Sequence, residues 1–140
     1  MKIVELLESD DYRGSHRAPG KDNGAPLHDL TGIYPDDIYG PKAAQYYGHY
    51  GQNHPLDVES ISKIQRMRNK PNQGVQIYRA VPKGINDIRP GDWVTINKNY
   101  AREHGEGTLQ GKYRIISKVT SAKNLYTDGN SIHEFGYDPS

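Results

Sequence analysis

Residues 76–99, QIYRAVPKGINDIRPGDWVTINKN, contain the strongest strand signals in the chain. The first signal is the run Val75–Val81, which is rich in β-branched and aromatic residues and is interrupted on its apolar face by Arg79. The second is Asp92–Asn97. A charge inside the most apolar strand needs a partner, because burying an unpaired charge is costly. We therefore predict two core strands, whose arginine, hydroxyl and amide groups together line a cleft for an anionic ligand.

The length and composition of the chain fit one globular domain. Its 140 residues can bury a sizeable core, although only 34% of them are hydrophobic. Eleven tyrosines supply most of the large apolar surface, and each hydroxyl needs water or a partner. The formal net charge of +1 gives no whole-chain field that favours nucleic acid or a membrane. Because the chain has no cysteine, a disulfide framework and cysteine-based zinc or nucleophile sites are excluded.

The predicted single domain covers residues 1–140 and has two parts. Residues 1–56 are rich in tyrosine, glycine and proline, and we predict them to be irregular apart from short elements, one of them a strand or helical turn at 2–8. We interpret this segment as an ordered region whose tyrosines pack on the core, or as a substrate lid or partner-binding loop. Residues 57–140 form the predicted helix and β core. The acidic start does not fit a signal peptide and no apolar run reaches membrane length, so we expect a cytoplasmic location.

Capping and stop signals place the other helices and strands. Asp57 is a good N-cap for the clearest helix, which Pro71 stops, and Gly48 and Gly105 end two shorter ones. Helices fall mainly in the N-terminal half and strands in the C-terminal half, which predicts an α+β fold with a mixed or antiparallel sheet. Basic residues gather on the clearest helix, either as a solvated face or as a contact for an acidic partner or nucleic acid. The predicted elements are helices at 41–47, 58–69 and 99–104 and strands at 113–119, 125–127 and within 128–138.

Several common site motifs are absent from the sequence. The run Gly107–Lys112 has three residues between its glycines where a phosphate-binding loop has four, and Tyr113 stands where that loop has Ser or Thr. Neither a Rossmann fingerprint nor Gly-x-Ser-x-Gly occurs. No metal site is predicted, because no recognised ligand spacing occurs among the loop histidines His16, His28, His49 and His54.

Three short motifs occur in a fixed order: Tyr78-Arg79-Ala80, then Trp93-Val94-Thr95-Ile96-Asn97 followed by Asn99-Tyr100-Ala101, then Ile132-His133-Glu134-Phe135-Gly136-Tyr137. Their order and spacing resemble the Arg, Ser/Thr and Glu signature of cholera-toxin-like ADP-ribosyltransferases. The run Arg89–Thr95 and the ending around Asp128-Gly129-Asn130 are more narrowly similar to short ADP-ribosyltransferase-like domains encoded by bacteriophages. The resemblance covers roughly residues 75–138 and implies an ADP-ribosyltransferase-like mixed or antiparallel β core with N-terminal helices.

The resemblance implies an NAD-dependent mono-ADP-ribosyltransferase that is phage-encoded and modifies a protein or nucleic acid in the cytoplasm of the bacterial host. NAD is then the co-substrate, and no metal is needed. Cleaving the nicotinamide–ribose bond develops an oxocarbenium-like charge, which a nearby carboxylate stabilises more in the transition state than in the ground state. By resemblance, that carboxylate belongs to Glu134, which also hydrogen-bonds the hydroxyls of the nicotinamide ribose.

The resemblance assigns the other site residues as well. Arg79 would hold a phosphate or the ribose through its planar guanidinium. Thr95 would support the strand pair and orient Glu134, which completes the predicted catalytic set of three residues. Besides Arg79 and Thr95, the predicted NAD-binding residues are Asn97 on the same face, Tyr100 against the nicotinamide ring, and Tyr78.

Two departures from the family pattern leave the acceptor open. Thr95-Ile96-Asn97 replaces the usual Ser-Thr-Ser, and Ile132 stands where arginine-modifying members have a second Glu or Gln. Arginine is therefore not the favoured acceptor, and asparagine, nucleic acid, a small molecule and water remain open. The alternatives are an NAD glycohydrolase, a catalytically silent member of the fold acting as a binding or inhibitory module, and a virion protein unrelated to NAD. Arg79 is equally able to pair with Asp92 or Glu134 inside the fold.

Overall fold

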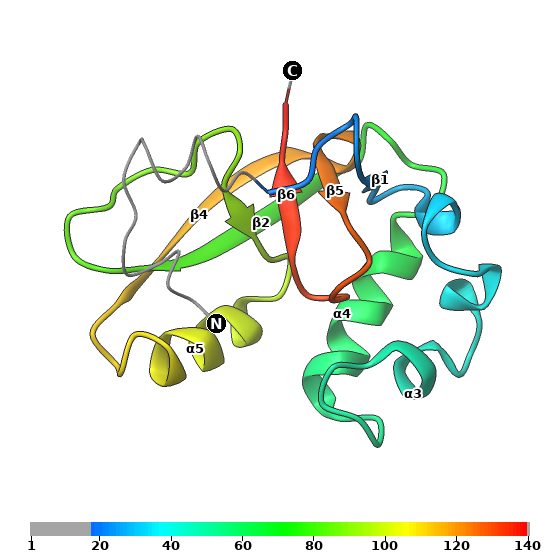
Figure 1. The fold of residues 1–140 in the computed structure, drawn as a ribbon, viewed down its shortest axis with the longest axis horizontal. Helices are drawn as coiled ribbons and strands as arrows, with labels where there is room; N and C mark the ends of the chain where they lie inside the picture. Colours follow the sequence, from blue (N-terminus) through cyan, green and yellow to red (C-terminus); the bar gives the residue numbers. More distant parts are fainter. Residues whose placement is uncertain (1–17, 140) are drawn as a thin grey trace.

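The computed structural model describes residues 18–139, so the strand or turn predicted at 2–8 lies outside the described residues (Figure 1). The fold is α+β, as predicted, and all of its strand pairs are antiparallel within the described range. It contains a two-stranded and a four-stranded sheet.

The longest strands pair with each other. β2 (Gly74–Val81) and β4 (Arg114–Ser121) run antiparallel in register over eight residues. Successive side chains of a strand point to opposite faces. The side chains on the inner face of β2 are buried, namely those of Val75, Ile77, Arg79 and Val81. The strand predicted at 75–81 is confirmed, and Arg79 points into the interior beside apolar side chains.

The second sheet consists of four short strands in the order β1-β5-β6-β3. Their bounds are Ala25–Pro26 for β1, Trp93–Val94 for β3, Leu125–Thr127 for β5 and Phe135–Tyr137 for β6. An isolated bridge joins this sheet to β2, because the N–H of Tyr78 donates to the carbonyl of Thr95 at 2.8 Å and the N–H of Thr95 donates back at 2.9 Å. The strand predicted at 92–97 is shorter than expected, since Asn97 already caps the next helix.

Within residues 18–139 three α-helices accompany the sheets, and Figure 1 shows α4 and α5 on opposite sides of β6. They are α3 (Ala43–Tyr47), α4 (Pro55–Arg66) and α5 (Lys98–Gly107). The prediction of Asp57 as an N-cap is wrong. α4 begins at Pro55, whose fixed φ suits the first helical position, and Nδ1 of His54 accepts the N–H of Leu56 at 3.1 Å. Asp57 is therefore inside the first turn, where its carboxylate is available for other contacts.

Two helix ends also differ from the prediction. α4 ends at Arg66, before the predicted end at residue 69, because Asn69 adopts a left-handed φ of 62° and its N–H donates to the carbonyl of His28. α5 continues through Gly105 to Gly107. The ring of Tyr113 packs so closely over Gly105 that a Cβ there would overlap it. This glycine is a packing residue and does not end the helix.

The part of the N-terminal segment that the structure describes is ordered around short elements. Besides β1 and α3 it contains 3₁₀ helices at Leu30–Gly32 and Asp36–Tyr39, and a further one at Ala122–Asn124 precedes β5. Tyr34 belongs to the buried core, and Tyr39 and Tyr47 pack against it. No helix within residues 18–139 is both long and apolar enough to cross a bilayer.

Candidate functional site

A pocket of about 480 Å³ lies between α5, the loop before α4 and the loop before β6. This volume falls in the range of roughly 300–1,000 Å³ that small-molecule sites occupy. Of the predicted site residues, Glu134 and Tyr100 are on its wall. The structure places Glu134 one residue before β6. The lining residues are His49, Tyr50, Tyr100, Glu103, His104, Thr108, Asn130, Ser131 and Glu134.

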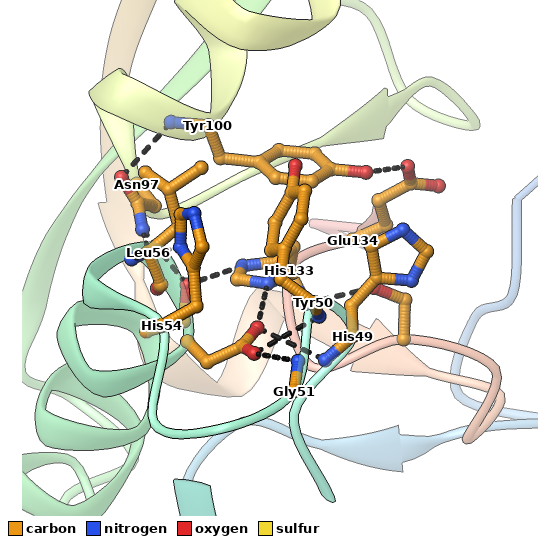
Figure 2. Close-up of polar contacts among 12 residues, drawn as sticks. His49, Tyr50, Gly51, His54, Leu56, Asn97, Tyr100, His133 and Glu134 are labelled. Atoms are coloured by element: carbon orange, nitrogen blue, oxygen red, sulfur yellow. Dashed lines mark hydrogen bonds and ion pairs between the residues drawn. The ribbon is translucent and has the colours of Figure 1, made fainter.

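Tyr100 holds the Glu134 carboxylate from above. Its phenol donates a hydrogen bond to Oε2 of Glu134, and its ring lies flat on the imidazole of His133, with centroids 4.4 Å apart and an interplanar angle of 10° (Figure 2). The backbone N–H of Tyr100 donates to Oδ1 of Asn97 at 3.0 Å, which fixes the start of α5. The orientation of Glu134 therefore depends on how Tyr100 and His133 are held.

Below these rings lies a buried polar cluster, which we call the Asp57 cluster; its members are Asp57, Ser60, Asn97 and His133. All four residues are 0% exposed. Nε2 of His133 lies 2.7 Å from Oδ1 of Asp57, and Nδ1 lies 2.7 Å from Oγ of Ser60. Nδ2 of Asn97 donates to Oγ of Ser60 at 3.0 Å and to the carbonyl of Leu56 at 3.1 Å. The cluster thus ties the start of α4 to the start of α5 and to the residue before Glu134.

The direction of these hydrogen bonds follows from the groups at the two ends. The Asn97 amide nitrogen can only donate and the Asp57 carboxylate can only accept. The lowered pKa of His133 favours the neutral imidazole, whose proton then lies on Nε2, facing Asp57, so Nδ1 accepts the hydroxyl of Ser60. Burial lowers the pKa of His133 below its ordinary value, and the hydrogen bond to Asp57 opposes this only in part. For Asp57, burial raises the pKa, but the hydrogen bonds from His133 and from backbone N–H groups outweigh it, so the pKa of Asp57 is lowered.

Asp57 also holds the loop that forms one wall of the pocket. Its Oδ1 accepts the N–H of His49 at 2.9 Å, and its Oδ2 accepts those of Tyr50 and Gly51 at 2.9 and 3.1 Å. Gly48 makes this approach possible, because a Cβ at that position would overlap the Asp57 carboxylate. The wall residues His49 and Tyr50 are exposed, yet their backbone is fixed by a buried charge.

The remaining predicted site residues do not reach the pocket wall. Arg79 is 3% exposed in its side chain, and its Nη1 lies 3.5 Å from Oδ2 of the buried Asp92. The structure thus realises the alternative in which Arg79 pairs with Asp92. Tyr78 and Thr95 form the bridge between the sheets, and Oγ1 of Thr95 accepts the N–H of Asn97 at 3.1 Å. Thr95 and Asn97 support the pocket from behind and do not line it.

Sequence reasoning missed most of the pocket and the whole Asp57 cluster. In the sequence, His49 stands out only as one of several loop histidines, and Tyr50 is one of many tyrosines in an irregular segment. Asp57 precedes an amphipathic run, as a capping residue does, and nothing local distinguishes a capping aspartate from one that accepts hydrogen bonds from a preceding loop. His133 adjoins the predicted Glu134, which was the one available signal.

The charges around the pocket favour a cationic or neutral ligand over an anion. Within residues 18–139 the lining includes two carboxylates, Glu103 and Glu134, and neither lysine nor arginine. Burial raises the pKa of Tyr50, and the carboxylates of Glu103, Asp57 and Glu134 add to this effect. In the same range, no group of three or more His, Asp or Glu side chains is placed to hold a metal ion.

Comparisons with known proteins gave no match to a family model, to a curated protein or to a solved structure. The resemblance to ADP-ribosyltransferases therefore rests on the sequence motifs.

Proposed function

We propose that this protein is an ADP-ribosyltransferase that cleaves NAD, and that the pocket receives the nicotinamide-ribose end of the dinucleotide. The observation that carries the proposal is a carboxylate, Glu134, held by a tyrosine hydroxyl on the wall of a pocket that also has aromatic rings. The nicotinamide of NAD is a planar cation, so both the carboxylates and the faces of Tyr50 and Tyr100 suit it.

Glu134 acts in this proposal on the charge that forms during bond cleavage. When the bond between ribose C1′ and the nicotinamide nitrogen breaks, its electron pair neutralises the pyridinium, and positive charge develops on the ribose. A fixed carboxylate beside C1′ stabilises that charge without having to reorganise. An acceptor nucleophile then bonds to C1′ and gives up its proton to water. The hydroxyl of Tyr100 keeps the Glu134 carboxylate in place for this step.

The pyrophosphate end of NAD requires a different placement from the one predicted. Arg79 is engaged with Asp92, and the described lining of the pocket supplies no lysine or arginine. We therefore place the phosphates outside the pocket, toward solvent, and assign Arg79 to holding β2 against the segment that leads into β3. Thr95 and Asn97 then serve as positioning residues behind Tyr100.

The acceptor is a protein or nucleic acid of a bacterial host in the first instance, with the host cytoplasm as the place of action. Water as the acceptor would make the protein an NAD glycohydrolase, and a silent binding module would consume no NAD. These alternatives separate in one experiment, in which purified protein is incubated with labelled NAD and a bacterial lysate. Label on a macromolecule supports transfer, and free nicotinamide without such label supports hydrolysis.

The decisive variant is Glu134→Gln, which keeps the shape of the side chain and removes its charge. We expect NAD turnover to fall by at least about 100-fold, because preorganised electrostatic groups of this kind supply factors of that order. Glu103→Gln is the matched control, since it removes a carboxylate from the same pocket without touching the contact to Tyr100. Equal turnover in the wild type and Glu134→Gln would refute the proposed role of Glu134. No NAD consumption by the wild type would refute the enzyme.

A further inference from the structure

We propose that Asp57 is a positioning residue for both walls of the pocket: it fixes the His49–Tyr50 wall directly and the Tyr100–Glu134 wall through His133. This inference rests on the proposed function for the identity of the ligand, but the anchoring itself can be measured without one. Asp57 belongs to neither wall, is 0% exposed and contacts no ligand in this scheme.

The first arm of the argument is the loop at 48–53. Three backbone N–H groups in a row, at residues 49–51, converge on one carboxylate. The loop then passes through left-handed backbone at Gly51, Gln52 and Asn53, with φ of 86°, 55° and 55°. Two non-glycine residues in this region are costly and persist only where their surroundings hold them. The Asp57 carboxylate is the buried group that holds this loop in place.

The second arm runs through His133. Nε2 of His133 faces Oδ1 of Asp57 at 2.7 Å, and one face of the same ring carries Tyr100, whose hydroxyl binds Glu134. Figure 2 shows this order, with the Tyr100 ring above His133 and its hydroxyl directed at Glu134. Tyr50 also contacts the imidazole, with ring centroids 5.6 Å apart. Both walls therefore meet on the ring that Asp57 orients.

Asparagine cannot replace Asp57 in both arms. If the amide nitrogen takes the place of Oδ2, it faces the N–H groups of Tyr50 and Gly51, which are also donors. If it takes the place of Oδ1, it faces the N–H of His49 and forces His133 to exchange its tautomer. Either way one wall loses its anchor, although the volume of the side chain is unchanged.

The test compares Asp57→Asn with Ser60→Ala and with Glu59→Gln. Hydrogen exchange of the amides of residues 49–51, followed by NMR, reports the anchoring, and NAD kinetics report its consequence. In the wild type we expect slow exchange at these amides although His49 and Tyr50 are exposed. In Asp57→Asn we expect that protection to be lost, and KM for NAD to rise and kcat to fall, each by about tenfold or more, because small displacements of positioning groups have effects of this size.

The two other variants separate the arms. Ser60→Ala removes the contacts of this hydroxyl to Nδ1 of His133 and to Nδ2 of Asn97 and leaves Asp57 in place. It should therefore keep the protected amides and KM and lower kcat alone. It also keeps the test valid if Asp57→Asn does not fold. Glu59→Gln changes a half-buried carboxylate of the same helix that lies outside the Asp57 cluster and should match the wild type. Unchanged amide exchange in a folded Asp57→Asn variant would overturn the anchoring. Lost amide protection with unchanged NAD kinetics would overturn the link between anchoring and catalysis, while the proposed function would stand. A wild type without NAD turnover would refute the proposed function, and the hydrogen-exchange data alone would then decide the anchoring.

Discussion

The Asp57 cluster and the Arg79–Asp92 pair are both buried and charged, yet they do different things in the fold. The pair lies within the strand framework. Oδ2 of Asp92 also accepts the N–H of Arg89 at 2.8 Å, and the backbone carbonyl of Asp92 accepts the N–H of Tyr137 at 3.0 Å. The Asp57 cluster lies directly under the pocket and contacts residues that line it. A charged residue in a recognisable strand motif can thus serve the framework, while residues that no motif marks shape the site.

The largest expected effect comes from breaking the Arg79–Asp92 pair. Arg79→Met leaves the Asp92 carboxylate buried without its ion-pair partner, and removing one member of such a pair costs about 3–5 kcal/mol of unfolding free energy. Chemical denaturation measures this loss. Adding Asp92→Asn removes the second charge and keeps an acceptor for Arg89, so most of the stability should return.

The same double variant tests whether Arg79 serves only the framework. We expect the folded Arg79→Met/Asp92→Asn protein to retain most of its NAD turnover, since neither residue lines the pocket. A stable double variant with no turnover would instead assign Arg79 a direct contact with NAD, as the family resemblance implied. The control is the single variant Arg79→Met, measured at a temperature at which it is folded. Its NAD turnover should match that of the double variant.

A smaller effect is expected from acidification below neutral pH, and within the Asp57 cluster it arises at His133. Burial lowers the pKa of His133, so the unfolded chain takes up a proton more readily than the folded protein. The stability that neutral His133 contributes is complete above about pH 6.5, the ordinary pKa of histidine, and is lost as the pH falls from there toward the folded pKa. One such group gives a slope of at most about 1.4 kcal/mol per pH unit.

This pH dependence is measured as the unfolding free energy from neutral pH down to about pH 5, in the window below the ordinary histidine pKa. His133→Gln is the informative variant, because it cannot titrate there. It should be less stable than the wild type at neutral pH and show a shallower slope on acidification. An identical slope in both proteins would mean that other histidines cause the dependence and that His133 is not held neutral by its surroundings.

The smallest stability effect is expected from Tyr100→Phe, which removes the hydroxyl on Glu134 and keeps the ring on His133. The unfolding free energy should fall by about 1 kcal/mol, the usual net contribution of one hydrogen bond. NAD turnover should fall by about tenfold, because the Glu134 carboxylate loses its orientation. This corresponds to about 1.4 kcal/mol in the activation free energy, which is more than the loss of unfolding free energy. Tyr113→Phe removes a hydroxyl that binds Glu106 outside the pocket and should leave turnover unchanged.

Sequence patterns predicted the framework well because its signals are local. The strand at 75–81, the strand at 125–127 and the α+β class follow from runs of β-branched and aromatic residues and from turn residues between them. Helix ends were less predictable. The sequence pattern predicted Asp57 as the cap, but His54 caps α4 and Pro55 begins it, three residues earlier than predicted. The need for a partner for Arg79 was also predictable, since a buried charge requires one, although two carboxylates were candidates.

The sequence by itself determined the strand framework, the placement of an arginine inside it and the presence of Glu134 and Tyr100 as candidate site residues. Only the tertiary structure decided which carboxylate pairs with Arg79, and that Asp57, Ser60, Asn97 and His133 meet beneath one pocket. The reason is physical: propensity and periodicity act between neighbours in the chain, whereas Asp57 and His133 are 76 positions apart and become partners only when packing excludes water from both.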